Sequence, residues 1–361
     1  MATIVGGFAS SHTPLMSLPG EDWAKRADDD TRNRELVRPR DGKRVPYDEL
    51  LATADPKIAQ EHIDESIFVR KYAAIQDGLD RLGEAFAECD PDVVVAIGDD
   101  QGEFFFDDNY PMISVYWGET LTHYPRLSNR PNMTAAVSIA AAVYGTEEIV
   151  YPIEQDLGLH IIEELQEHDF DVAQQRYMKE EYGGTIGPAT WYLDSQRSVK
   201  PRRQGMPHAF SFPVCRWFKG KRPPMVPITI NTCYPPNWIS PRRAYALGRQ
   251  VHEAILNWDK DVRVAIVTSG GLSHFTVDEE IDRLAIKGLT EANGDILSTL
   301  PRYKLQSATT EILNWVAASG AMGDTKMEVM TYQPGYRSPA GTGCGVCVGR
   351  WVTNGNGNGK H

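Results

Sequence analysis

No stretch of this 361-residue chain approaches the roughly 18 consecutive apolar residues that a membrane-spanning helix requires. The first residues also lack the basic region and the apolar stretch of a signal peptide. These two absences predict a cytoplasmic protein without membrane contact.

Basic residues are scarce relative to acidic ones, since 37 Lys and Arg stand against 49 Asp and Glu for a formal net charge of -12. A nucleic-acid surface needs clustered Lys and Arg to neutralise phosphates, so this balance disfavours a nucleic-acid partner. We expect a small molecule as the ligand.

Cysteine is scarce as well. The five cysteines, an odd number in apolar surroundings, fit reduced thiols better than a disulfide framework (Cys89, Cys215, Cys233, Cys344 and Cys347). Cys344 and Cys347 form a C-x-x-C pair, but no second pair follows to complete a zinc site. We expect both to be buried thiols.

What the sequence does contain is an alternation of short apolar runs with segments of helical periodicity, which predicts an α/β fold. We expect one domain with a central, mostly parallel mixed sheet flanked by helices. The expected strands are 3–5, 93–97, 112–116, 225–231 and 262–267, and the expected helices are 67–86, 132–144, 155–167, 241–258, 278–291 and 307–318.

This domain should occupy residues 1–353 and carry two long loop insertions. The first, about 16–67, is polar, charged and without a sustained period, and the second, about 174–204, is rich in turn residues with a basic end. Loops this long in compact domains are usually functional or mobile. The low-complexity segment 354–361 should be a flexible tail.

Two histidines follow apolar runs that end in glycine or serine. His12 follows the first run, and His274 follows the run 262–267 through Gly270, Gly271, Leu272 and Ser273. Sites in open α/β sheets lie beyond the carboxyl ends of the strands, so both imidazoles should lie at one edge of the sheet. That placement suggests metal or proton chemistry, with capping of the next turn as the alternative for His12.

A non-haem iron(II) site typically takes two imidazoles and one carboxylate. Glu311 is a candidate for the carboxylate because Ile312 and Trp315 stand on the apolar side of its helix, and a carboxylate buried there needs a cation. The alternative is an exposed helical glutamate. His208, placed just before an expected strand, could donate a hydrogen bond to substrate or oxygen, or could serve structure alone.

Taken in order, these motifs resemble the class III extradiol ring-cleavage dioxygenases, the family of the protocatechuate 4,5-dioxygenase catalytic subunit. The resemblance rests on Ser-Ser-His-Thr-Pro around His12, Pro-Asp-Val-Val-Val from Pro91, Pro-His at His208, Asn-Thr-Cys-Tyr-Pro-Pro from Asn231, Gly-Gly-Leu-Ser-His ending at His274, and Glu311. It spans nearly the whole chain. The insertion and the segment Gly-Asp-Asp-Gln look most like the branch containing 3-O-methylgallate 3,4-dioxygenase.

The resemblance implies that His12 and Glu311 bind iron(II), that His274 is the catalytic acid/base and that His208 faces the substrate. One position departs from the pattern, because Gln101 stands where the family often has its second metal-binding histidine. We expect Gln101 to complete the metal site with its amide oxygen. Other candidates for that role are Asp100, His62 and His123.

The implied function is iron(II)-dependent extradiol cleavage, with dioxygen, of a catechol-type aromatic acid such as a methylgallate, gallate or protocatechuate, in the catabolism of lignin-derived aromatics. Arg337 and Ser273 are expected to bind substrate, and Arg202 and Arg203 are further partners for a ring carboxylate. The family resemblance also suggests a homodimer.

The departure at Gln101 motivates a second hypothesis. In it, the protein lacks oxygen chemistry and acts as a metal-free binding subunit, or as a lyase or hydrolase that uses His274 and His208.

Overall fold

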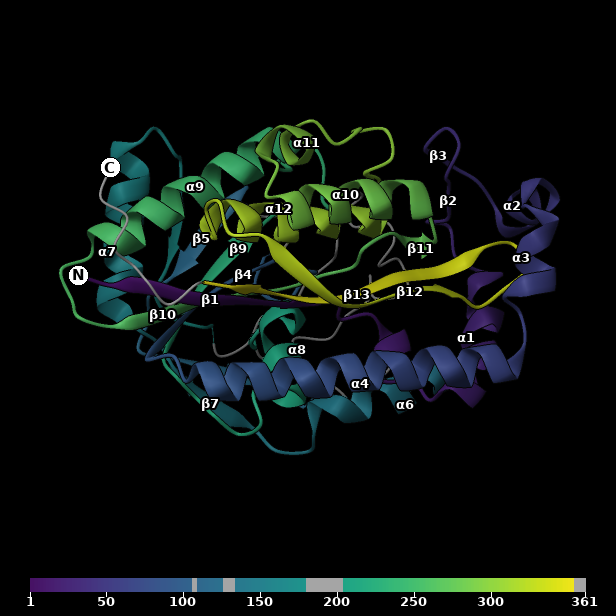
Figure 1. The fold of residues 1–361 in the computed structure, drawn as a ribbon, viewed down its shortest axis with the longest axis horizontal. Coiled ribbons are helices and arrows are strands. Elements are labelled where there is room, and N and C mark those ends of the chain that lie inside the picture. The colour runs from purple at the N-terminus through teal and green to yellow at the C-terminus, as the bar shows by residue number, and fades with distance from the viewer. Residues whose placement is uncertain (106–108, 126–133, 180–203, 354–361) are drawn as a thin grey trace.

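The computed structural model describes residues 1–105, 109–125, 134–179 and 204–353. Figure 1 shows a central sheet with helices on both faces. The nine strands of this sheet follow the order β11-β13-β1-β10-β4-β9-β5-β8, with β12 paired to β13. The predicted α/β fold with a mostly parallel mixed sheet is therefore confirmed.

The strands of the central sheet are β1 (Thr3–Ser10), β4 (Val93–Gly98), β5 (Ile113–Tyr116), β8 (Ala173–Gln175), β9 (Met225–Ile230), β10 (Arg263–Ser269), β11 (His274–Thr276), β12 (Met327–Tyr336) and β13 (Thr342–Val352). Two small antiparallel pairs are formed by β2 (Val37–Arg38) with β3 (Lys43–Arg44), and by β6 (Thr120–His123) with β7 (Ile149–Pro152).

The α-helices are α1 (Trp23–Asp30), α2 (Tyr47–Thr53), α3 (Pro56–Glu61), α4 (Glu65–Cys89), α6 (Ala135–Ala140), α7 (Gln155–Glu167), α8 (His208–Arg216), α9 (Pro241–Asn257), α10 (Glu279–Glu291), α11 (Gly294–Ser298) and α12 (Ile312–Ala321). Four 3-10 helices accompany them: η1 (Pro14–Met16), η2 (Gly20–Asp22), η3 (Ala141–Tyr144) and η5 (Ser307–Glu311).

Two apolar clusters, one on each face of the sheet, hold these layers together. Helices α7, α9, α10, α11 and α12 contribute to one cluster, and α4, α6 and α8 contribute to the other. The C-x-x-C cysteines divide between the two, with Cys347 in the first and Cys344 in the second. Since strand side chains alternate between faces, residues three apart on β13 point to opposite sides and do not form a pair.

Four central strands, β1, β10, β4 and β9, run parallel to one another. Of these, β4, β9 and β10 are buried on both faces almost throughout, which explains their runs of Val and Ile. Because they are parallel, their carboxyl ends meet at one edge, which brings together the residues that follow Ser10, Gly98, Ile230 and Ser269. The other strands attach at the two sides of this parallel group.

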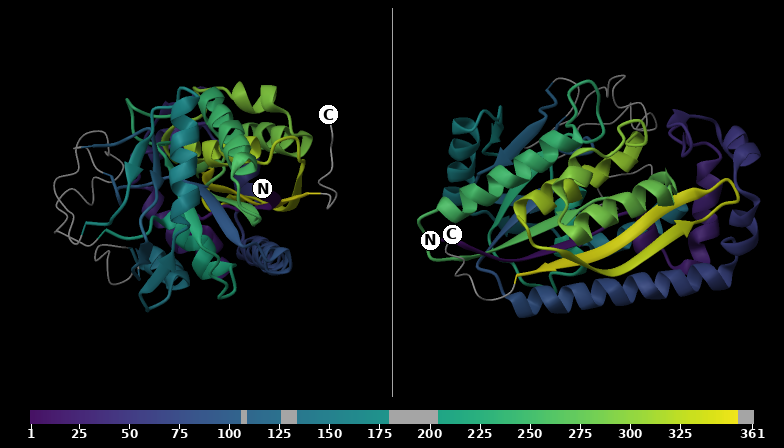
Figure 2. Two further views of the ribbon diagram at one scale, coloured as in Figure 1. Left: turned by 90° about the vertical axis from the view of Figure 1, so that its left-hand side faces the viewer. Right: turned by 45° about the horizontal axis from the view of Figure 1, so that its top comes forward.

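Two expectations about elements are wrong, and a third is right except for the type of its first turn. The first insertion is not irregular, since it folds into α1, α2, α3 and the hairpin β2–β3 at the end of the molecule far from the N-terminus (Figures 1 and 2). His208 does not precede a strand but begins helix α8. The expected helix 307–318 begins with five residues of 3-10 helix, so Glu311 ends η5 and directly precedes α12.

Some segments cannot be compared with the expectations. Most of the second insertion, residues 180–203, lies outside the described residues, as does the tail 354–361. Arg202 and Arg203 fall in that part. Among the described residues, no helix is both long enough and apolar enough to cross a bilayer.

Candidate metal centre and active site

The site forms around one buried carboxylate, that of Glu311, which is 0% exposed. His12, two residues beyond β1, places its Nε2 3.0 Å from Glu311 Oε2. His274, at the start of β11, places its Nε2 3.2 Å from Glu311 Oε1. Glu311 is therefore not the exposed helical glutamate of the alternative interpretation, and two imidazoles share it.

The hydrogen bonds of His12 define which ring nitrogen carries its proton. The Ser269 hydroxyl donates its only hydrogen to the carbonyl oxygen of Ala209, at 2.6 Å. Ser269 Oγ must then accept from His12 Nδ1, 2.8 Å away, so the proton of a neutral His12 is on Nδ1. Nε2 is left with a lone pair, and it faces the Glu311 carboxylate.

His208 completes a group of three with His12 and Glu311. Each of the three offers one ligand atom, and these atoms lie within 4.8 Å of one another, with all three residues buried. The rings of His208 and His12 have centroids 4.2 Å apart. His208 Nδ1 donates to Glu103 Oε2 at 2.9 Å, so Nε2 is the ring nitrogen that carries the lone pair of a neutral His208.

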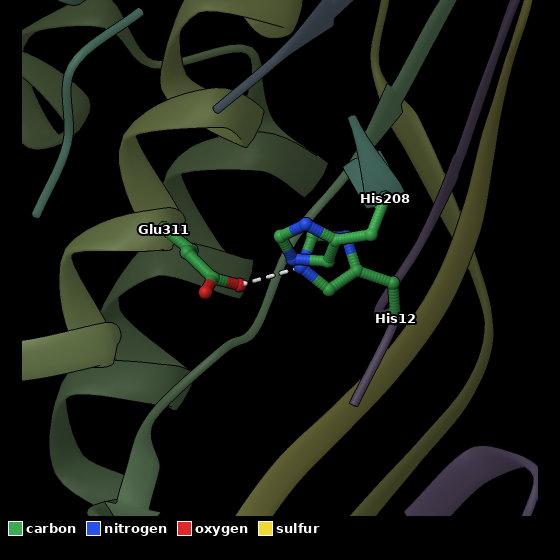
Figure 3. A group of neighbouring side chains, drawn as sticks. All are labelled: His12, His208 and Glu311. Carbon is green, nitrogen blue, oxygen red and sulfur yellow. Dashed lines mark ion pairs between the residues drawn. The ribbon is translucent and has the colours of Figure 1, made fainter. Parts of the chain in front are cut away.

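This group fits a divalent metal ion. Figure 3 shows the three side chains pointing toward one another from three different parts of the chain. The buried Nε2 of His12 has no hydrogen-bond partner although the carboxylate is 3.0 Å away. A lone pair facing a carboxylate is satisfied when a cation lies between them, and two imidazoles with one carboxylate are a usual set for ferrous iron.

The carboxylate of Glu311 also receives two protein donors. The backbone N–H of Gly271 donates to Oε2 at 2.6 Å, and Gln101 Nε2 donates to Oε1 at 2.6 Å. Burial by itself would raise the pKa of Glu311, but the neighbouring His274 holds it well below its ordinary value. Burial likewise opposes the charged form of His274, but Glu311 raises its pKa well above the ordinary value.

A second group of ligand atoms shares Glu311. Asp99, Cys233 and Glu311 place one atom each within 4.8 Å of one another. Burial, with Glu311 close by, raises the pKa of Asp99 to about 7, and burial also raises the pKa of the Cys233 thiol. Asn314 Nδ2 donates to Asp99 at 2.8 Å, and Thr310 lies 3.2 Å from the thiol. Asp99 and the Cys233 thiol thus already have hydrogen-bond partners within the protein.

The turn that presents His274 is packed tightly. A Cβ at Gly271 would lie 2.3 Å from the His274 ring, so no larger residue fits there. Thr309 Oγ1 accepts from the His274 N–H at 3.0 Å and donates to its carbonyl oxygen at 2.9 Å. His274 Nδ1 donates to the carbonyl oxygen of Leu272, which leaves Nε2 for chemistry. Thr309 thereby links this turn to η5, which carries Glu311.

Gln101 lies in the site, where the structure gives it a different contact from the expected one. Its amide nitrogen donates to Glu311 and, at 3.3 Å, to Asp99. The amide oxygen was the expected ligand, and it would reach this position only if the side-chain amide rotated by about half a turn so that its oxygen and nitrogen exchanged places. Gln101 as a metal ligand stays a prediction.

The other candidates for the third ligand have partners of their own. The Asp100 carboxylate accepts four backbone N–H groups, those of residues 102–105. His62 lies 3.3 Å from Lys71 Nζ and its ring packs on Tyr336. His123 Nε2 donates to the carbonyl oxygen of Tyr144. None of the three belongs to the group around Glu311.

The two expected substrate-binding residues are buried in internal contacts. Arg337 donates from Nε and Nη2 to the two oxygens of Asp30, at 2.7 and 2.8 Å. Ser273 donates its hydroxyl to Asp282 at 2.9 Å and accepts from the N–H of Asp278. A ring carboxylate would have to compete with Asp30 for Arg337, and a substrate role for either residue stays a prediction.

Three residues important to this geometry were not singled out from the sequence: Ser269, Thr309 and Glu103. Ser269 and Thr309 were visible only as neighbours of candidate residues. Glu103 carried a stronger signal, because it stands two residues after Gln101 in the segment already identified as a departure from the family pattern. Its partner His208 is 105 positions away, so the contact itself is not visible in the sequence.

Comparison with known proteins identifies the family of this chain. The model of the family described as the catalytic LigB subunit of aromatic ring-opening dioxygenase matches residues 70–347. No curated protein matches the chain. Among solved structures, the uncharacterized protein JW3007 from Escherichia coli K12 aligns with 76% of this chain and 91% of its own, at 11% identity and a TM-score of 0.43.

Proposed function

Since the chain belongs to the LigB family of aromatic ring-opening dioxygenases, we propose that it is an iron(II)-dependent extradiol dioxygenase. Its proposed substrate is a catechol-type aromatic acid, such as a methylgallate, gallate or protocatechuate. The observation that carries the proposal is the meeting of His12, His208 and Glu311, in which an orphaned imidazole nitrogen faces a buried carboxylate.

In this proposal His12 Nε2, His208 Nε2 and the Glu311 carboxylate hold the metal. Ferrous iron, when bound, would supply the redox chemistry that lets a catechol react with dioxygen. The protein fixes both imidazoles by their Nδ1 protons, on Ser269 and Glu103, so that each Nε2 keeps its lone pair.

His274 is the proposed acid/base. The carbonyl oxygen of Leu272 accepts its Nδ1 proton, so Nε2, which faces Glu311, is the atom that would exchange a proton with a ring hydroxyl once a metal ion neutralises that carboxylate. The contact of this Nε2 with Glu311, at 3.2 Å, places it beside the proposed ligands without making it part of their group. His274 therefore handles the proton while the other two imidazoles hold the metal.

Oxygen consumption tests this function. We expect protein loaded anaerobically with Fe²⁺ to consume dioxygen with at least one of 3-O-methylgallate, gallate and protocatechuate, and to yield a ring-opened product. The variant His274→Phe should retain iron and lose turnover. If iron-loaded protein consumes no oxygen with any catechol, the proposed function is wrong.

One observation favours the alternative of a metal-free protein. The Glu311 carboxylate already has protein partners in Gln101, Gly271 and His274. In this alternative His274 and His208 would serve a binding subunit, a lyase or a hydrolase. Elemental analysis of protein purified without chelator separates the two, because near-stoichiometric iron excludes the metal-free form.

A further inference from the structure

We propose that Glu103 is a positioning residue that prepares His208 to bind the metal. This inference rests on the proposed function, because it gives Glu103 a role only if a metal is bound at His208. Glu103 lies in the loop after β4, which also carries Gln101.

Glu103 holds His208 by both its ring and its main chain. Its Oε2 accepts from His208 Nδ1 at 2.9 Å, and both of its oxygens lie 3.2 Å from the His208 backbone nitrogen, whose N–H they accept. Each of the two side chains is only 10% exposed. A ring held at these two places has one orientation and one tautomer, in which Nδ1 carries the proton.

The loop that carries Glu103 is itself held rigidly. Asp100 accepts the N–H groups of Gly102, Glu103, Phe104 and Phe105 at 2.7–3.1 Å, and the Tyr110 hydroxyl donates to the same carboxylate at 3.0 Å. A turn with four of its N–H groups fixed on one side chain has little freedom. Glu103 therefore meets His208 from a preorganised backbone, which is what precise placement of a ligand requires.

His208 needs a partner of negative charge for a second reason. It is the first residue of helix α8, whose positive N-terminal end favours a negative charge nearby. A carboxylate on Nδ1 also makes Nε2 a better donor to a metal. Glu103 therefore suits both the end of the helix and the imidazole that begins it.

The loop after β4 consequently contributes to the metal centre without supplying a histidine. Gln101 donates to Glu311, and Glu103, two residues later, accepts from His208. Each contact orients one of the proposed ligands. The second imidazole of the centre comes from helix α8 in place of this loop.

Metal binding to the full-length protein tests the role of Glu103. Equilibrium dialysis with Co²⁺ and Fe²⁺ should show one ion bound per chain, with an affinity reduced roughly 10–100-fold in Glu103→Gln and in Glu103→Ala. The visible absorption of bound Co²⁺ should change in shape in both variants, since one ligand is altered. Glu119→Gln is the matched control. The Glu119 side chain is exposed and only its backbone carbonyl oxygen has a partner, the N–H of Ile153, so this variant should bind both ions as the unaltered protein does.

A double-mutant cycle shows whether Glu103 acts through His208. His208→Ala alone should weaken binding, and adding Glu103→Ala should cause little further loss. Additive losses would overturn the inference, and so would unchanged affinity and spectrum in Glu103→Gln, the variant that preserves side-chain shape if Glu103→Ala fails to fold. If the unaltered protein binds neither ion, the proposed function fails together with the inference. If the unaltered protein binds metal and only the Glu103 variants behave otherwise than expected, the inference fails and the proposed function stands.

Discussion

Glu35, in the first insertion, is a carboxyl group that is only 2% exposed. Burial raises its pKa to about 8, although Arg44, with Nε 3.2 Å away, acts to lower it. The folded protein therefore keeps a proton that the unfolded chain releases near pH 4.5. The stabilisation from this group is complete below pH 4.5 and is lost as the pH rises toward 8.

In the variant Glu35→Gln, residue 35 has no group that titrates in this pH range. We expect its stability relative to the unaltered protein to improve between pH 5 and pH 8, as measured by urea unfolding at both values. Glu119→Gln, at an exposed site, should follow the pH profile of the unaltered protein. Parallel profiles for Glu35→Gln and the unaltered protein would contradict the prediction.

At this scale the sequence was most informative where a residue conflicts with its surroundings. His12 and His274 could be placed at one sheet edge because strands precede them, and Glu311 stood out as a carboxylate among apolar residues. The partners that decide the chemistry could not be found in this way. The contacts of His12 with Ser269 and of His208 with Glu103 span 257 and 105 positions, and no local pattern encodes them.

The packing of α9 against α12 positions Glu311, which directly precedes α12. The two helices lie very close together at Gly248, where a Cβ would lie 1.9 Å from the carbonyl oxygen of Ala317 and 2.8 Å from the backbone nitrogen of Ala321. Since both obstacles are backbone atoms, a side chain at Gly248 must push the helices apart.

We expect Gly248→Ala to lower the free energy of unfolding by about 3 kcal/mol, at the upper end of typical overpacking costs. It should also weaken metal binding, because a displaced α12 moves Glu311. Urea unfolding and Co²⁺ dialysis measure the two effects. Glu253→Ala, at an exposed position of the same helix, should change stability by less than about 0.5 kcal/mol, and an equally mild effect at Gly248 would refute this packing argument.

Elements with strong periodicity were predicted well, and those shaped by distant contacts were not. The expected helices 67–86 and 155–167 correspond to α4 and α7. Helix α8 was missed because its aromatic residues resemble a strand, and because the group that accepts its first N–H is Glu103, from another loop. The short helices of the first insertion are too polar to show a clear period.

On the scale of the whole molecule, one buried ion pair joins the first insertion to the antiparallel strand pair β12–β13. Asp30 ends α1, and Arg337 follows β12. Both side chains are nearly fully buried, at 0% and 3% exposure, and the Thr342 hydroxyl also donates to Asp30. Burial and neighbouring acids act in opposite directions on Arg337, with Asp30 raising its pKa above the ordinary value.

Removing one partner of this pair leaves a buried charge without compensation. We expect Asp30→Ala to cost about 3–5 kcal/mol of stability in urea unfolding. The double variant Asp30→Leu with Arg337→Met should be less damaging, because it removes both charges. Arg32→Ala, at a side chain 76% exposed and paired with Asp29, is the surface control and should cost less than about 1 kcal/mol. If Asp30→Ala costs no more than this control, the pair does not hold the insertion in place.

The position of β1 in the sheet sets the order in which the site can be assembled. This first strand pairs only with β10 and β13, so among the described strands it has no neighbour before residue 263. During synthesis β1 and His12 are therefore made before β4, α8 and β9, and the strand partners of β1 follow all three. The three proposed ligands meet only after Glu311 has been translated, so a nascent chain shorter than that has no complete centre with which to capture a metal ion.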